Sequence, residues 1–149
     1  MLPDKLKLAA KLGATHTVDA RDANAVEAVR DITGGGADFA FEMAGVTPAM
    51  ELAYRITRRG GTTVTASLFH PQHTWPIQQV SLVAEERTVK GSYIGSCVPA
   101  RDIPRYVGLY LRGKLPIDKL LGERMKLEDI NRGFDKLDAG ESMRDLVVF

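Results

Sequence analysis

Cysteine, long apolar runs and charge of one sign are scarce in this sequence, and each shortage excludes a class of protein. The single cysteine, Cys97, cannot form an internal disulfide, so we expect a reducing compartment, the cytoplasm. No apolar run is long enough to cross a bilayer, and we expect no membrane partner. The first residues enter a charged helical pattern directly, which is not the pattern of a signal peptide.

Positive and negative charges nearly balance. The 149 residues include 20 Lys and Arg against 19 Asp and Glu, a formal net charge of +1, and the two signs are interspersed. No basic surface of the kind that binds nucleic acid is indicated, so we expect no nucleic-acid partner. The hydrophobic fraction of 44% and the length of the chain are sufficient for a buried core.

Patterns for two kinds of catalytic site are missing or incomplete. The nucleophile elbow G-x-S-x-G does not occur, which argues against a Ser-His-Asp hydrolase. His70 and His73 form an H-x-x-H pair, but no third ligand accompanies them. We interpret the pair as part of a surface loop rather than as a metal site.

Helix and strand signals alternate along the chain. Thr47 followed by Pro48 predicts a helix with a hydroxyl cap, and Gly60-Gly61 predicts its end. Strands separated by helices of this length favour right-handed parallel crossovers, hence an α/β fold with a parallel sheet. The other expected helices span residues 5–12, 22–33, 102–113 and 127–139, and the expected strands span residues 15–19, 37–42, 62–67, 88–94 and 144–149.

Short motifs follow one another in a fixed order over nearly the whole chain. In this order and at this spacing they resemble the C-terminal part of the zinc-type medium-chain alcohol and polyol dehydrogenases. Each motif alone is weak, and the complete series is specific. The motifs are K-L-x-x-A-x-x-L-G-A-T at 5–15, G-G-G-A-D at 34–38, F-E-x-x-G at 41–45, R-G-G-T at 59–62, K-G-S at 90–92, R-D-I-P at 101–104, I-N-x-G-F-D at 130–135 and G-E-S-x-R at 140–144.

The resemblance implies two parts. Residues 1–95 would form a partial Rossmann-type domain with a parallel sheet and flanking helices, lacking the first βαβ unit. Residues 96–149 would be the helices and strands that join the catalytic domain in the family. For residues 15–19, whose usual neighbouring strand is not in this sequence, we expect pairing with residues 37–42 as a right-handed crossover.

The resemblance also implies cofactor contacts on the nicotinamide side of an NAD or NADP site. Arg144 matches an arginine that reaches the pyrophosphate, although a solvated or salt-bridged arginine is an equal alternative. Glu42 ends a strand in the cleft, and we interpret it as a hydrogen-bond acceptor for local backbone. The implied contact residues are Lys5 near the adenosine ribose, Met43 and Ala44 lining the cleft, Ala66, Ser67 and Leu68 under the nicotinamide, Tyr93 and Ile94 at its carboxamide, and Arg144.

Two features that the family needs are not in this sequence. There is no G-x-G-x-x-G phosphate loop, and Gly34-Gly35-Gly36 follows a helix and precedes a strand, which is the wrong polarity. The family's zinc ligands are absent as well. We therefore expect weak or absent NAD(P) binding, no zinc, and no catalysis by this chain alone.

Three hypotheses on function remain open. The chain is the C-terminal part of an NAD(P)-dependent alcohol dehydrogenase, or a self-association or interaction module, or a truncated product that complements a separate chain. The resemblance implies a dimer through residues 75–94, which offer Val80, Leu82, Val83 and Val89 for burial.

Overall fold

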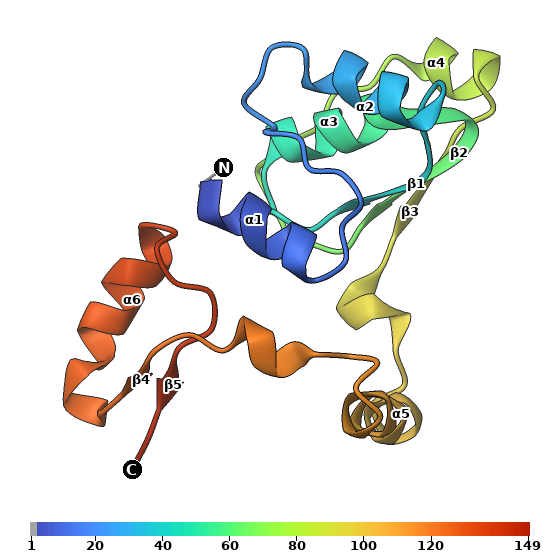
Figure 1. Cartoon of the computed structure of the whole chain (residues 1–149). Coiled ribbons are helices and arrows are strands. Elements are labelled where there is room, and N and C mark those ends of the chain that lie inside the picture. The colour runs from blue at the N-terminus through green and yellow to red at the C-terminus, as the bar shows by residue number, and fades with distance from the viewer. Residues whose placement is uncertain (1–2) are drawn as a thin grey trace. The chain divides into compact units, whose positions relative to one another are not determined.

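A three-stranded parallel sheet lies at the centre of the first of the two units into which the chain divides, Met1–Cys97 and Val98–Phe149. The computed structural model describes residues 3–149 (Figure 1). The strands are β1 (Ala37–Glu42), β2 (Thr57–Thr65) and β3 (Thr88–Gly91), in the order β1-β2-β3, and both pairs are parallel. The expected α/β class with a parallel sheet is confirmed.

Two helices pack on one face of this sheet. Helices α2 (Ala25–Thr33) and α3 (Thr47–Ile56) contact each other and the strands. Ala40 points to the helices and is buried, whereas Phe39 and Phe41 on the opposite face are 63% and 64% exposed. This alternation follows from the period of two along a strand. The buried apolar residues of this unit are Ala25, Val26, Ala40, Met50, Ala53 and Tyr54.

The passage from α3 to β2 corrects our expectation about Gly60-Gly61. Helix α3 ends at Ile56, and β2 begins with the next residue, so the glycine pair lies inside the strand. The register of β1 and β2 shifts between Ala37 and Phe39, which accommodates extra residues in β2. A Cβ on Gly61 would come within 2.7 Å of the Thr57 methyl group. The pair therefore serves an irregularity of the sheet rather than a helix end.

The start of α3 also differs from expectation. Thr47 is the first helical residue, Val46 occupies the cap position, and no side chain caps the helix. Pro48 lies in the first turn, as expected. The helix is stabilised by burial of Met50, Ala53 and Tyr54 rather than by a capping hydroxyl.

Residues 15–19 do not form a strand, and the expected pairing with residues 37–42 is wrong. Thr15, His16 and Val18 instead line a hollow with α2 and α3. The Asp19 carboxylate accepts a hydrogen bond from the Arg21 backbone (3.0 Å), which favours a turn. The segment is thus held by local turns and by contacts with α2 and α3 rather than by an edge of β1.

Helix α1 (Pro3–Lys11) and helix α4 (Gln79–Ala84) complete the first unit together with the short η1 (Tyr93–Ser96). Helix α4 was not predicted. Tyr54 on α3 contacts both α4 and the chain before it: its hydroxyl lies 2.6 Å from that of Ser81 on α4, and its ring meets Trp75 edge-on. The Arg87 guanidinium stacks over the same ring.

The second unit consists of helices and one very short pair of parallel strands. The expected strand 144–149 is shorter than predicted, and its partner β4 was not foreseen. No described helix, including the 13-residue α5, is long and apolar enough to cross a membrane. The elements are α5 (Pro99–Leu111), η2 (Ile117–Leu120), β4 (Arg124–Met125), η3 (Leu127–Asp129), α6 (Ile130–Asp138) and β5 (Leu146–Val147), with β4 paired to β5.

Substitution Thr57→Val should destabilise the first unit by about 1–3 kcal/mol. The Thr57 and Thr63 side chains are fully buried, their hydroxyls lie 2.8 Å apart, and Thr57 also donates to the carbonyl of Ala53 at 2.8 Å. Valine keeps the shape but leaves the Ala53 carbonyl and the Thr63 hydroxyl each short of a partner. Urea unfolding measures the change. The control Thr62→Val, on the half-exposed neighbouring position, should change stability by less than about 0.5 kcal/mol, and equal losses in both variants would contradict the assignment.

Candidate functional site

The three strands of the sheet end at the same level. Glu42 is opposite Thr65, and Thr65 is opposite Gly91. The ladder continues one residue further, because the Ala66 N–H donates to Glu42 (3.1 Å) and the Ser92 N–H donates to Thr65 (2.9 Å). We call residues 42–45, 65–68 and 91–94 the carboxyl edge. In open α/β sheets, ligands bind outside this end of the strands.

Most of the predicted cofactor residues lie on the carboxyl edge. They follow three strands that are separate in sequence, and the parallel register brings them to one place. The side chains of Met43, Leu68, Tyr93 and Ile94 are 71%, 82%, 69% and 65% exposed. Their contact with a cofactor stays a prediction. The predicted residues on the edge are Met43, Ala44, Ala66, Ser67, Leu68, Tyr93 and Ile94.

A buried carboxylate shapes the turn after β1. Glu42 is 2% exposed, and its Oε1 accepts the backbone N–H groups of Ala44 (2.6 Å) and Gly45 (2.7 Å). Its Oε2 accepts the Thr65 hydroxyl at 2.9 Å. The interpretation of Glu42 as an acceptor for local backbone is confirmed. Gly45 has φ of 72°, and a Cβ there would lie 3.5 Å from that of Ser67, so the turns after β1 and β2 approach closely.

The turn after β3 has unusual backbone conformations. The strand ends at Gly91, so the expected strand 88–94 is too long. Ile94, Gly95 and Ser96 have φ of 48°, 65° and 53°, in the left-handed region that a β-branched residue such as isoleucine rarely adopts. The hydroxyls of Ser92 and Ser96, 3.1 Å apart, brace the turn. Strained turns of this kind cluster at ligand sites, where they present backbone groups in fixed directions.

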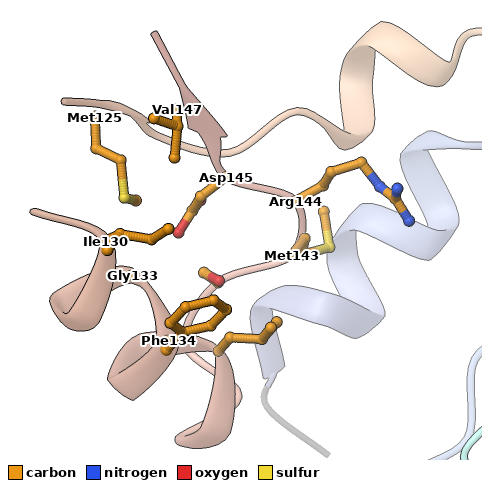
Figure 2. A pocket seen from close by; sticks show the side chains of 10 residues that line it. Met125, Ile130, Gly133, Phe134, Met143, Arg144, Asp145 and Val147 are labelled. Atoms are coloured by element: carbon orange, nitrogen blue, oxygen red, sulfur yellow. The ribbon is translucent and has the colours of Figure 1, made fainter. Parts of the chain in front are cut away.

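Lys5 and Arg144 are not part of the carboxyl edge. Lys5 lies on α1 and is half-buried. Arg144 belongs to the second unit, where its carbonyl accepts the N–H of Gly122 at 2.7 Å. Its guanidinium is exposed and leads away from Ile130 and Phe134 (Figure 2).

The second unit contains an apolar hollow beside Arg144, which the sequence did not reveal as a pocket. Its volume is about 420 Å³. Figure 2 shows Phe134 and Met125 facing into it from different segments. The one carboxylate on its wall, Asp145, accepts the Glu123 backbone N–H at 2.8 Å and so holds the chain beside β4. The remaining lining residues are Ile130, Gly133, Leu137, Ser142, Met143, Arg144 and Val147.

The residues present do not fit a zinc site. Across residues 3–149, no three His, Cys, Asp or Glu side chains come together in a way that could hold a metal ion. The His70 and His73 rings lie 5.5 Å apart on their loop, tilted against each other. Cys97, at the end of the first unit, is half-buried.

A second buried carboxylate, Asp102, lies in the first turn of helix α5, and its burial was missed by the sequence reasoning. It accepts the Val98 backbone N–H at 2.8 Å. It also accepts hydrogen bonds from Nε and Nη2 of the Arg101 guanidinium, each at 2.8 Å. Arg105 adds a weaker contact at 3.4 Å. The hydrogen bonds from Arg101 and then from Val98 lower the pKa of Asp102 from 3.8 to about 2. The R-D-I-P motif thus stabilises the first turn of helix α5.

Substitution Asp102→Asn should remove a pH-dependent part of the stability of α5. Because the folded pKa is depressed, the carboxylate stabilises the fold above its usual value of 3.8, and this contribution is lost as pH falls towards about 2. The stability difference between the natural chain and the variant should therefore be largest near neutral pH and shrink through this window. Urea unfolding at several pH values measures it. Asp118→Asn, at an exposed position of η2, is the control, and a difference for Asp102→Asn that does not vary with pH would refute the ion-pair explanation.

Comparison with known proteins agrees with the resemblance that the motif series indicated. The family described as "Zinc-binding dehydrogenase" matches residues 1–112. The chain is 33% identical to alcohol dehydrogenase-like 5 of Arabidopsis thaliana, covering 95% of this chain and 37% of that protein. It is 32% identical to S-(hydroxymethyl)glutathione dehydrogenase of Paracoccus denitrificans, covering 98% of this chain and 41% of that protein.

Solved structures agree with the sequence relatives. Benzyl alcohol dehydrogenase from Acinetobacter calcoaceticus superposes with a TM-score of 0.91 at 27% identity, covering 97% of this chain and 40% of the other. An alcohol dehydrogenase zinc-binding domain protein from Burkholderia ambifaria gives a TM-score of 0.90 at 30% identity, with 97% and 39% covered. The chain thus spans about two fifths of the length of the relatives it matches.

Proposed function

The chain belongs to the zinc-binding dehydrogenase family, and from this premise we propose that it supplies the nicotinamide side of an NAD(P)-dependent alcohol dehydrogenase. The observation that supports the proposal is the carboxyl edge, where residues from three strands end at one level. Its location would be the reducing cytoplasm, in keeping with the single Cys97. Of the three hypotheses on function, this one accounts for the common level at which the three strands of the first unit end.

The residues of the carboxyl edge fit the nicotinamide end of a dinucleotide. Met43 and Leu68 offer exposed apolar contact, and the turn that follows Tyr93, left-handed from Ile94, would present backbone groups to the carboxamide. Gly45 lets the turns after β1 and β2 approach closely beside Ser67. When bound, the cofactor exchanges hydride with an alcohol or ketone. In the same proposal Arg144 would reach the pyrophosphate and Lys5 the adenosine ribose.

Two further parts of the chemistry would come from residues that this sequence does not contain. The phosphate loop G-x-G-x-x-G is missing from it, and the described His, Cys, Asp and Glu residues do not fit zinc. A pyrophosphate normally gains several charge-assisted hydrogen bonds at such a loop. The chain alone should therefore bind NAD(P) weakly and should not catalyse.

Calorimetric titration of the chain with NAD and NADP tests this proposal. Without the phosphate loop, losing a few charge-assisted hydrogen bonds of roughly 1.5–3 kcal/mol each should move the dissociation constant from micromolar towards millimolar. Amide resonances of the carboxyl edge, followed by NMR at millimolar cofactor, should shift, whereas those of α6 serve as an internal control. A low-micromolar dissociation constant would contradict the predicted weakness, and unchanged amides at residues 42–45 would contradict the assignment of the edge.

Self-association is the second candidate function, and exposed apolar residues on α4 and β3 favour it. Val80 and Val83 on α4 are 67% and 73% exposed, and Val89 on β3 is 38% exposed. Among residues 3–149, no further strand pairs with β3, so the sheet ends there and leaves an open edge. A dimer through residues 75–94 would bury these groups.

A separate chain that complements this one is the remaining alternative. At the other edge of the sheet, β1 has no strand beside it in the described part of the chain, and Phe39 and Phe41 are exposed. Parallel sheets are normally covered on both faces. A partner that pairs with β1 and also packs against Phe39 and Phe41 would extend the sheet and cover this face.

Light scattering at micromolar concentration should give a mass above the 16.3 kDa of one chain. Substitution Val83→Lys places a charge in the proposed contact and should shift the protein to monomer without unfolding it, because the side chain is exposed. Asn131→Lys, at an exposed position on α6 outside residues 75–94, is the matched control and should leave the mass unchanged. A monomer for the natural chain would exclude the dimer.

A further inference from the structure

Glu42 is a buried carboxylate whose hydrogen-bond partners are all uncharged. It is 2% exposed, and its oxygens accept two backbone N–H groups and one hydroxyl, from Ala44, Gly45 and Thr65. Within residues 3–149, no Lys, Arg or His forms an ion pair with it. Asp102, a second buried carboxylate in the described part of the chain, is by contrast paired with Arg101 and Arg105.

This arrangement stabilises a negative charge without cancelling it. Two backbone N–H groups and one hydroxyl donate to the carboxylate of Glu42, and none of these three donors is charged. Neutral dipoles hold the charge in place but leave its net value at −1. At a buried site the field of such a charge is screened less than in water, so it acts over several ångströms.

The field of Glu42 acts at the carboxyl edge. The groups that hold the carboxylate are the backbone of the turn after β1 and the last residue of β2, so they are themselves part of this edge. The oxidised nicotinamide ring carries a positive charge, and the reduced ring is neutral. A fixed negative charge beside the ring attracts one form and not the other.

We propose that Glu42 makes the carboxyl edge select the oxidised, cationic form of the nicotinamide ring over the reduced form. The inference rests on the proposed function, since it requires the ring to bind at this edge. Glu42 then has two roles: it positions the turn at Ala44 and Gly45, and its charge sets the preference between the two redox forms. The first role is structural, and only the second depends on the charge.

The test compares dissociation constants of the oxidised and reduced cofactor for the natural chain and for Glu42→Gln, by NMR titration. Both forms carry the same pyrophosphate, so weak phosphate binding cancels in their ratio. Glutamine removes the charge at nearly the same shape, and binding of the oxidised form should weaken relative to the reduced form by about three- to tenfold. Thr65→Val is the matched control, because it removes a hydrogen bond to Glu42 but keeps the carboxylate, and its ratio should stay near that of the natural chain.

The outcomes separate this inference from the proposed function. If neither cofactor form shifts the edge amides of the natural chain, the proposed function fails, and this inference fails with it. If both forms bind and Glu42→Gln leaves their ratio unchanged, only the inference is overturned. An equal change of the ratio in Thr65→Val would also overturn it, since geometry rather than charge would then set the preference. Circular dichroism of each variant shows whether the fold is kept, and if Glu42→Gln does not fold, Glu42→Asp, which keeps the charge on a shorter side chain, must preserve the preference.

Discussion

The common level at which β1, β2 and β3 end is the constraint on which the rest of the first unit depends. Because Glu42, Thr65 and Gly91 stand opposite one another, the three turns that follow them share one edge. A slip of one residue in a parallel pair would turn the side chains to the other face. Ala40 would then leave the core, and Phe39 or Phe41 would have to enter it.

Buried polar groups help to hold this register, in addition to apolar burial. The Thr57–Thr63 hydroxyl pair fixes the end of α3 against β2. At the other end of the strands, Glu42 joins the turn after β1 to Thr65. Buried polar groups that lose their partners are costly, so each contact favours one alignment over its neighbours. The small apolar core does not need to supply this specificity by itself.

The second unit is organised by a different kind of contact. Its parallel pair of strands has two residues in each strand, and the Asp102 carboxylate joins the first turn of α5 to the Val98 backbone and to Arg101. Gly122 lies close to Asp145, since a Cβ there would come within 2.1 Å of the Asp145 carboxylate, which would have to move aside. Much of the apolar surface of α6 stays open, including Phe134 at 60% exposed. Within residues 98–149 only Met125 and Asp102 are buried, so this unit has little interior of its own.

The sequence by itself predicted the fold class, the family and the residues at the carboxyl edge. The alternation of apolar segments predicted the parallel α/β fold, and the motif order predicted the family. The motif order also predicted which residues follow each strand, and therefore which residues make up the carboxyl edge. These properties depend on local periodicity and on motif order, which a single sequence records directly.

Only the tertiary structure decided how the polar groups pair and where segments end. The sequence could not show that Glu42 accepts Thr65, that Gly60-Gly61 lies inside β2, or that residues 15–19 leave the sheet. Glycine, threonine and glutamate are compatible with several local structures, so partners distant in sequence determine which one forms. For residues 15–19 the strand pattern is present, but a strand needs a neighbour, and the neighbour is a property of the assembled fold.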